Sequence, residues 1–203
     1  MIKKRFETAV RHEQIAEAAL DIVRSDGIKG LNVAAVAKKV GIVPSAVYRH
    51  FKNKSEIVTA VLTLIQTRLN QNYRDVIQRD LEPIEKLNIV LRKHVELIAG
   101  NNAIPRIIFS EEVIGGMPEK QQQLYGIIRD VIGNVASIVA EGQEKGSIRK
   151  DLSAETIAVS FLGMIQPAAI IWNMSDGEFD LVQHSKNAWM LFLDAIRESV
   201  RTI

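Results

Sequence analysis

Apolar residues recur at helical spacing along almost the whole chain, and this periodicity limits the fold more than any other feature. The first stripe runs from Ile15 to Val23 and stops at the turn signal Ser25-Asp26-Gly27. No convincing alternation of apolar and polar residues with the period of two that is typical of strands is present. The sequence therefore predicts an all-α protein with about nine helices.

The residue types exclude most catalytic and metal chemistry. The chain has 203 residues and no cysteine, so it has no disulfide, thiolate nucleophile or thiolate metal ligand. Its four histidines share no metal-ligand spacing, and neither a Ser/His/Asp arrangement nor a phosphate loop is evident. We find no secretion signal and no run of the roughly 18 uninterrupted apolar residues that a membrane span requires. A cytoplasmic protein that is not an enzyme and carries neither cofactor nor metal is expected.

Charge is distributed unevenly along the chain. Residues 1–54 contain 11 Lys or Arg against five acids and carry a net charge of +6, whereas the remainder carries −4. Clustered Lys and Arg bind polyanions because they release condensed counterions. A polyanion-binding head and a merely solvated basic face explain this asymmetry equally well.

Local signals place the remaining helices. Asn32 is a suitable cap for a short helix that ends at Gly41, and Pro44 suits the first turn of another that runs to about Phe51. The segment Asn53-Lys54-Ser55-Glu56 then opens a long helix. The long helix and those after it are expected over the approximate ranges 54–78, 83–98, 103–114, 118–146, 157–174 and 181–200.

Residues 33–52 fit a helix-turn-helix on packing grounds. Two short helices that cross closely need a small residue at the contact, a turn residue that tolerates a left-handed backbone, and an apolar residue in the wedge. Ala37, Gly41 and Val47 meet these three needs. With Val47 facing inward, helical geometry turns four polar side chains outward. They are Ser45, Tyr48, Arg49 and Lys52.

This outward set has the chemistry that the major groove of DNA requires. Arg49 can bond guanine O6 and N7, Ser45 can reach a base edge or a phosphate, and Tyr48 can contact the backbone or a thymine methyl. His50 lies near the edge of the buried arc and is interpreted as a packing or phosphate residue. For Tyr48 and His50, simple closure of the three-helix core remains an alternative.

At this point the sequence resembles the TetR family of bacterial transcriptional regulators. The resemblance covers about residues 11–60 and is strongest at Tyr48-Arg49-His50-Phe51 followed by Lys52-Asn53-Lys54. It implies a homodimer that reads a palindromic operator of double-stranded DNA with residues 1–54, while residues 55–203 bind an effector and dimerise. Carried over by position, it makes Asn32, Ser45, Tyr48, His50 and Lys54 DNA contacts. Val43 departs from the pattern, because many members have a hydroxyl residue there.

The segment 157–174 predicts a subunit interface. It is apolar on almost every side, and a chain of this size has little left to cover it. We expect this helix and the last one to pair with their copies in a second subunit; a helix central to one subunit is the alternative. The predicted interface residues are Ile165, Ala169, Ala188, Trp189, Phe192 and Ile196.

An effector pocket is predicted from large aromatic residues and from polar residues in apolar surroundings. Its candidate residues are His94, Phe109, Tyr125, Phe161, Gln166, Trp172 and Asn173. Core packing explains each of them equally well. The composition favours a small, largely apolar effector, and the resemblance implies that this effector releases a repressor from its operator. Pro167 is expected to kink the apolar helix. A DNA-binding protein controlled by a protein partner, or without any inducer, is the alternative; Glu111 and Glu112 are assigned to a solvated face.

Overall fold

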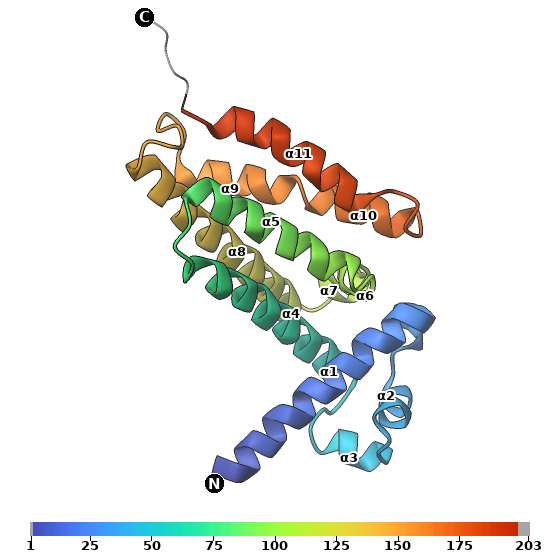
Figure 1. Cartoon of the computed structure of the whole chain (residues 1–203). Helices are drawn as coiled ribbons and strands as arrows, with labels where there is room; N and C mark the ends of the chain where they lie inside the picture. Colours follow the sequence, from blue (N-terminus) through green and yellow to red (C-terminus); the bar gives the residue numbers. More distant parts are fainter. Residues whose placement is uncertain (1, 199–203) are drawn as a thin grey trace, which may run out of the picture. The chain divides into compact units, whose positions relative to one another are not determined.

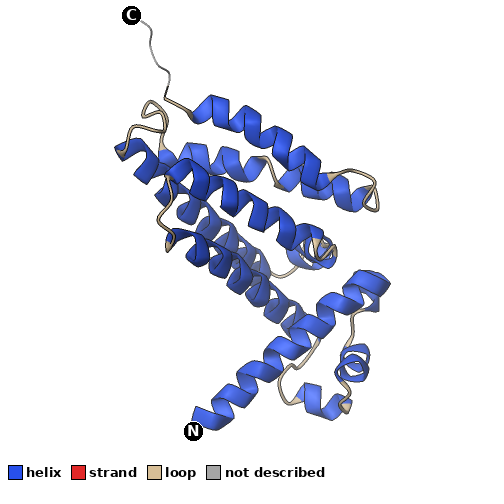
Figure 2. Ribbon diagram, viewed as in Figure 1, coloured by secondary structure: helices blue, strands red, loops and turns tan. Residues whose placement is uncertain are grey.

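Eleven α-helices make up the part of the chain that the structure, a computed structural model, describes: the backbone of residues 2–198 and the side chains of residues 8–198. No strand occurs in this part, which carries one isolated antiparallel bridge between Ile148 and Arg197. Figures 1 and 2 show the helices, whose bounds are α1 Ile2–Gly30, α2 Val33–Val40, α3 Pro44–Tyr48, α4 Lys54–Ile77, α5 Pro83–Ala99, α6 Ala103–Ile108, α7 Glu111–Ile114, α8 Pro118–Glu144, α9 Ala154–Gly163, α10 Gln166–Met174 and α11 Leu181–Ile196. The all-α prediction is confirmed for these residues.

The two helices beyond the predicted nine arise because two predicted helices are divided. Residues 103–114 form α6 and α7, and residues 157–174 form α9 and α10. Proline explains the second division: inside a continuous helix Pro167 would leave the carbonyl of Gly163 without its hydrogen bond. Instead of the expected kink, α9 ends at Gly163 and Pro167 occupies the first turn of α10.

The helix-turn-helix is held by short-range contacts. Asn32 caps α2 by accepting a hydrogen bond from the backbone N–H of Ala35 at 2.9 Å. Gly41 ends α2 in the left-handed region with a φ of 75°, where a side chain would be strained. Val43 gives α3 no side-chain cap, and Pro44 lies in the first turn. These three local signals therefore act as the sequence predicted.

The described chain divides into two compact units. Unit 1 contains residues 1–68 and 101–126, and unit 2 contains residues 69–100 and 127–203. These units do not follow the predicted division after residue 54, since residues 55–68 and 101–126 pack with the head; α6, for example, packs on α1. The core of unit 1 includes Ile15, Leu20, Leu31, Val36, Val47, Ile57, Leu62 and Ile107.

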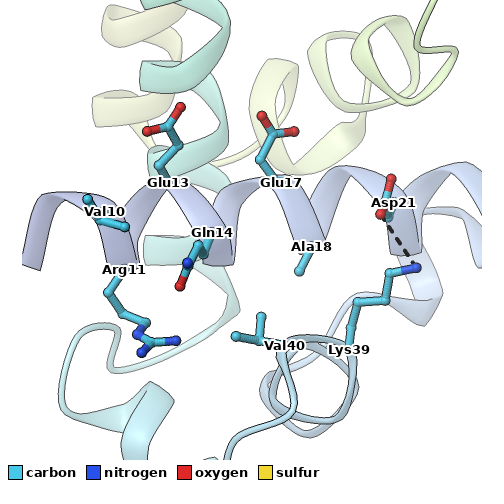
Figure 3. A pocket seen from close by; sticks show the side chains of 9 residues that line it. All are labelled: Val10, Arg11, Glu13, Gln14, Glu17, Ala18, Asp21, Lys39 and Val40. Carbon is cyan, nitrogen blue, oxygen red and sulfur yellow. Dashed lines mark ion pairs between the residues drawn. The ribbon is translucent and has the colours of Figure 1, made fainter. Parts of the chain in front are cut away.

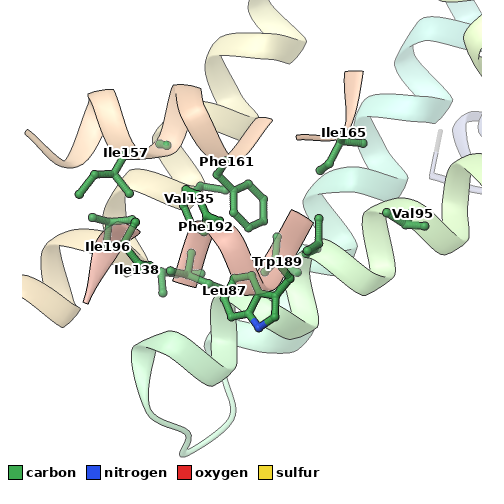
Figure 4. Packing of buried hydrophobic residues seen from close by; sticks show 14 of the residues in the cluster. Leu87, Val95, Val135, Ile138, Ile157, Phe161, Ile165, Trp189, Phe192 and Ile196 are labelled. Atoms are coloured by element: carbon green, nitrogen blue, oxygen red, sulfur yellow. The ribbon is translucent and has the colours of Figure 1, made fainter. Parts of the chain in front are cut away.

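The core of unit 2 is built from α5, α8, α9, α10 and α11 with the end of α4. Phe161 is fully buried at its centre, and its ring centroid lies 5.7 Å from that of Phe192. The ring of Phe192 lies 6.0 Å from that of Trp189. Figure 4 shows these rings among Leu87, Val95, Val135, Ile138, Ile157, Ile165 and Ile196.

One described segment has the length and composition of a membrane span. An 18-residue window within Ala154–Met174 has a mean hydropathy of 1.5, because Glu155 is the one charged residue of the segment. The run is not uninterrupted, as the sequence analysis stated, but its mean hydropathy is high enough for a candidate span. The segment is divided between α9 and α10, and its inner residues, such as Ile157 and Phe161, are buried in unit 2. Since buried helices of soluble proteins pass the same test, it is weak evidence for a membrane.

Five of the six residues predicted at a dimer interface are buried within one chain. They are Ile165, Ala169, Trp189, Phe192 and Ile196. Within one chain they are covered because the apolar stripe of α11 packs on α5 and α10. Ala188 is partly exposed. The exposed faces of α9 to α11 carry other apolar residues, namely Val159, Ile170, Ile171, Met174, Val182, Met190 and Leu191.

Candidate nucleic-acid interface

Three of the four residues predicted to point outward lie on α3 or directly after it, on the side away from the core. Val47 is fully buried, whereas Ser45 and Arg49 are exposed and Tyr48 is 55% exposed. Tyr48 therefore does not close the core. The helix is shorter than predicted: α3 ends at Tyr48, and the N–H groups of residues 50 and 51 both bond to the carbonyl of Val47 at 2.9 Å.

Lys52 follows the helix instead of belonging to it. Its side chain is exposed, and its backbone N–H donates to Oε2 of Glu56 at 2.7 Å. Asn53 in turn accepts from the N–H of Glu56 at 3.0 Å, which caps the start of α4. The loop thus presents Lys52 next to α3, although helical geometry was the wrong reason to expect it there.

Two further predicted contacts, Asn32 and Lys54, have their polar atoms engaged locally. Asn32 is exposed, but besides capping α2 it donates from Nδ2 to the carbonyl of Gly30 at 3.2 Å. Lys54 starts α4, and its Nζ donates to the carbonyl of Ile28 at 2.8 Å. The same Nζ lies 3.5 Å from Oε2 of Glu112. A phosphate would therefore compete with existing partners for the Lys54 ammonium.

His50 is half-buried and packs on aromatic rings. Its ring meets that of His12 edge to face at 5.4 Å, and the His12 ring lies 4.5 Å from that of Phe51. Burial, with further contributions from His12, Arg11 and Arg49, lowers the pKa of His50 below 6.5. Neutral His50 is thus favoured, in agreement with a packing role.

Two open grooves flank α1 in unit 1. The first, of about 560 Å³, lies between α1 and α2, where Asp21 and Lys39 form an ion pair at 3.4 Å. Figure 3 shows Arg11 and Val40 on one side of α1, with Glu13 and Glu17 pointing to the other. The second groove, of about 620 Å³, lies between α1 and α4 and includes His12 and His50. The mixed charges of the first groove do not form a basic DNA surface.

Comparison with known families agrees with this geometry. The family described as "Bacterial regulatory proteins, tetR family" matches residues 15–61, which include the helix-turn-helix. The family described as "YsiA-like protein, C-terminal region", a TetR C-terminal family, matches residues 65–195 and so more than half of the chain. This chain belongs to the TetR family. It is a DNA-binding transcriptional regulator and not an enzyme.

Individual relatives of this TetR-family protein cover nearly its whole length. The fatty acid metabolism regulator protein of Bacillus subtilis (strain 168) is 25% identical over 186 residues, which are 92% of this chain and 95% of the relative. The crystal structure of the transcriptional regulator FadR from Bacillus subtilis in complex with stearoyl-CoA has a TM-score of 0.78 at 25% identity, and the match covers 91% of this chain and 99% of that one. The repressor KstR2 of Mycolicibacterium smegmatis is 23% identical, with 95% and 94% covered.

The seven predicted pocket residues of this TetR-family protein are not brought together in one unit. Phe109 and Tyr125 belong to unit 1, and Tyr125 is exposed. The other five belong to unit 2, where Phe161 is part of the packed core and His94 is buried. Neither of the two grooves contains any of the seven. Phe161 packs in the hydrophobic core of unit 2 and lines neither groove.

The sequence analysis missed a charged cluster at the start of α8. Lys120 is buried, and its Nζ lies 3.1 Å from Oε1 of Glu112, which was assigned to a solvated face. No local pattern gave a signal, because the two residues are eight positions apart and belong to different helices. A lysine between a glutamate and a glutamine, as Lys120 is, has the local sequence of an ordinary exposed residue.

Proposed function

We propose that this protein is a cytoplasmic repressor that binds a palindromic operator as a homodimer and leaves it when a small, largely apolar effector binds. The observation that carries the DNA-binding part is the outward face of α3. Ser45, Tyr48 and Arg49 are exposed above a buried Val47, so the helix can enter the major groove without disturbing its packing. Lys52 adds a positive charge beside it.

The exposed apolar residues of α10 and α11 support the homodimer. Met174 is 78% exposed, Leu191 76% and Met190 59%. Exposed apolar residues concentrated on adjoining helices mark an interaction surface, and a two-fold pairing of identical helices would cover each set with its copy. The predicted interface is thus kept on the same helices but moved to their outer faces.

A long-chain acyl thioester is the effector class that we propose. The Bacillus subtilis relative is a fatty acid metabolism regulator, and FadR from that organism was crystallised with stearoyl-CoA. The interior of unit 2 is almost entirely apolar, as an acyl chain requires.

Release from DNA tests this proposal directly. A fluorescent operator fragment, recovered from genomic DNA with the purified protein, is titrated with the protein and then with stearoyl-CoA. We expect the anisotropy to fall to that of free DNA, whereas acetyl-CoA, which has the same nucleotide but no long chain, leaves the complex intact. If acyl-CoA of every chain length leaves the protein–DNA complex intact, the result would favour control by a protein partner or the absence of an inducer.

Replacing Arg49 and Lys52 separately should distinguish base reading from phosphate binding. Arg49→Ala is expected to cost about 1 to 3 kcal/mol on the operator and to relax base preference at one position of each half-site. Lys52→Ala is expected to weaken binding to every duplex and to reduce the slope of log K against log salt by about one per subunit. Binding to operator variants at several salt concentrations measures both effects. Equal behaviour of the two variants would show that the roles are misassigned.

A further inference from the structure

Glu112 bridges two lysines from different parts of unit 1. Its Oε1 lies 3.1 Å from Nζ of Lys120 on α8, and its Oε2 lies 3.5 Å from Nζ of Lys54 at the start of α4. Each carboxylate oxygen thus faces a different ammonium group. The three side chains form a network of two ion pairs, which connects α8 through Glu112 on α7 to the start of α4.

The two lysines differ sharply in their access to solvent. The Lys120 side chain is only 4% exposed, whereas the Lys54 side chain is 33% exposed. A buried ammonium needs a carboxylate to offset its lost hydration. Glu112 therefore cannot leave Lys120 without a large cost, but its contact with Lys54, which is longer and more exposed to water, is weaker and can be exchanged.

Lys54 has one donor to spare. An ammonium group has three N–H donors, of which one bonds to the Ile28 carbonyl at 2.8 Å and another faces Glu112. A DNA phosphate that approaches the third donor also approaches the negative charge of Glu112. The phosphate and the carboxylate thus compete for the same positive charge.

We propose that Glu112 lowers operator affinity by holding the charge of Lys54, and that Lys120 limits this effect by drawing on the same carboxylate. The inference rests on the proposed function for operator binding itself, and it takes Lys54 as a phosphate contact because the family resemblance makes this residue a DNA contact. Glu112 itself touches no DNA and acts as a positioning residue. If a movement of α7 or α8 separates Glu112 from Lys120, the Glu112 carboxylate interacts more strongly with Lys54. Lys54 then attracts a phosphate less, and DNA binding weakens.

Two substitutions with opposite expected signs test the proposal in the full-length protein. Glu112→Gln keeps an acceptor for Lys120 and removes the charge. It is expected to tighten binding to an operator fragment about 3- to 10-fold and to steepen the salt slope by about one per subunit, because Lys54 becomes free to neutralise a phosphate. Lys120→Met keeps the side-chain length and is expected to weaken binding several-fold.

Three comparisons make the result decisive. Glu111→Gln changes the charge of the exposed neighbour by the same amount and should alter affinity less than twofold. The effects of Glu112→Gln and of Lys120→Met on affinity should both vanish when Lys54 is also replaced by Met. Thermal unfolding measured alongside shows that each variant is folded. The proposal is overturned if folded Glu112→Gln binds no more tightly than the Glu111 control, or if its gain persists without Lys54. Failure of the unchanged protein to bind any duplex would instead overturn the proposed function.

Discussion

Replacing Leu191 with arginine is expected to separate the two subunits and to lower operator affinity at least about a hundredfold. Leu191 is the more exposed of two adjacent large apolar residues on α11, and the proposed two-fold pairing would bury it against its copy. Two arginines brought together there would be desolvated and would repel each other. Once apart, each head binds its half-site alone and loses the effective concentration that linkage provides, typically about 10²- to 10⁴-fold.

Light scattering of the purified variant gives the mass, and anisotropy on whole and half operators gives the affinity. Gln122→Arg, which adds the same charge at an exposed position of α8, is the matched control and should leave both unchanged. If Leu191→Arg stays dimeric with normal affinity, the interface lies elsewhere. If the unchanged protein is a monomer at micromolar concentration, the homodimer itself is refuted.

Acidification is expected to destabilise the protein through His94 by about 2 to 3 kcal/mol between pH 7.5 and 4.5. Burial lowers the pKa of His94 from 6.5 to about 4. Between these values the unfolded chain binds a proton at this residue and the folded chain does not, so the free energy of unfolding falls as the pH falls. Above pH 6.5 both states are neutral at His94 and the effect is absent.

Urea unfolding at several pH values measures this contribution when His94→Leu is compared with the unchanged protein. The carboxylates and the other histidines contribute equally to both, so their effects cancel in the difference. Between pH 7.5 and 4.5, the free energy of unfolding of His94→Leu should fall by about 2 to 3 kcal/mol less than that of the unchanged protein. This difference does not depend on the stability of the variant at pH 7.5. Parallel stability curves for the two proteins would show that His94 is hydrated or protonated in the folded state.

The helix-turn-helix was predictable because its signals are local. Asn32, Gly41 and Pro44 each act through their own backbone or through residues within five positions, so the sequence alone places the ends of α2 and the start of α3. The end of α3 was less predictable. There the chain leaves the helix after Tyr48, where a capping network between Lys52, Asn53 and Glu56 takes over.

The body was harder to predict because periodicity identifies an apolar stripe but not what covers it. Trp189 and Phe192 lie on the strongest stripe of α11, and that stripe is used inside one chain. Leu191, which was not among the predicted interface residues, is exposed. The ion pairs of Glu112 with Lys120 and Lys54 were not predicted for a related reason, since these residues are brought together only by tertiary packing.

The brevity of α3 affects what a genetic screen of this regulator would return. A helix of five residues without a side-chain cap has too few internal hydrogen bonds to persist alone. Its shape therefore depends on the packing of its own buried residue Val47 and of Phe51, which follows it. Mutants selected for lost DNA binding should therefore cluster at Val47 and Phe51 as well as at Arg49. Val47 and Phe51, which contact no base, could then be mistaken for residues that recognise the DNA sequence.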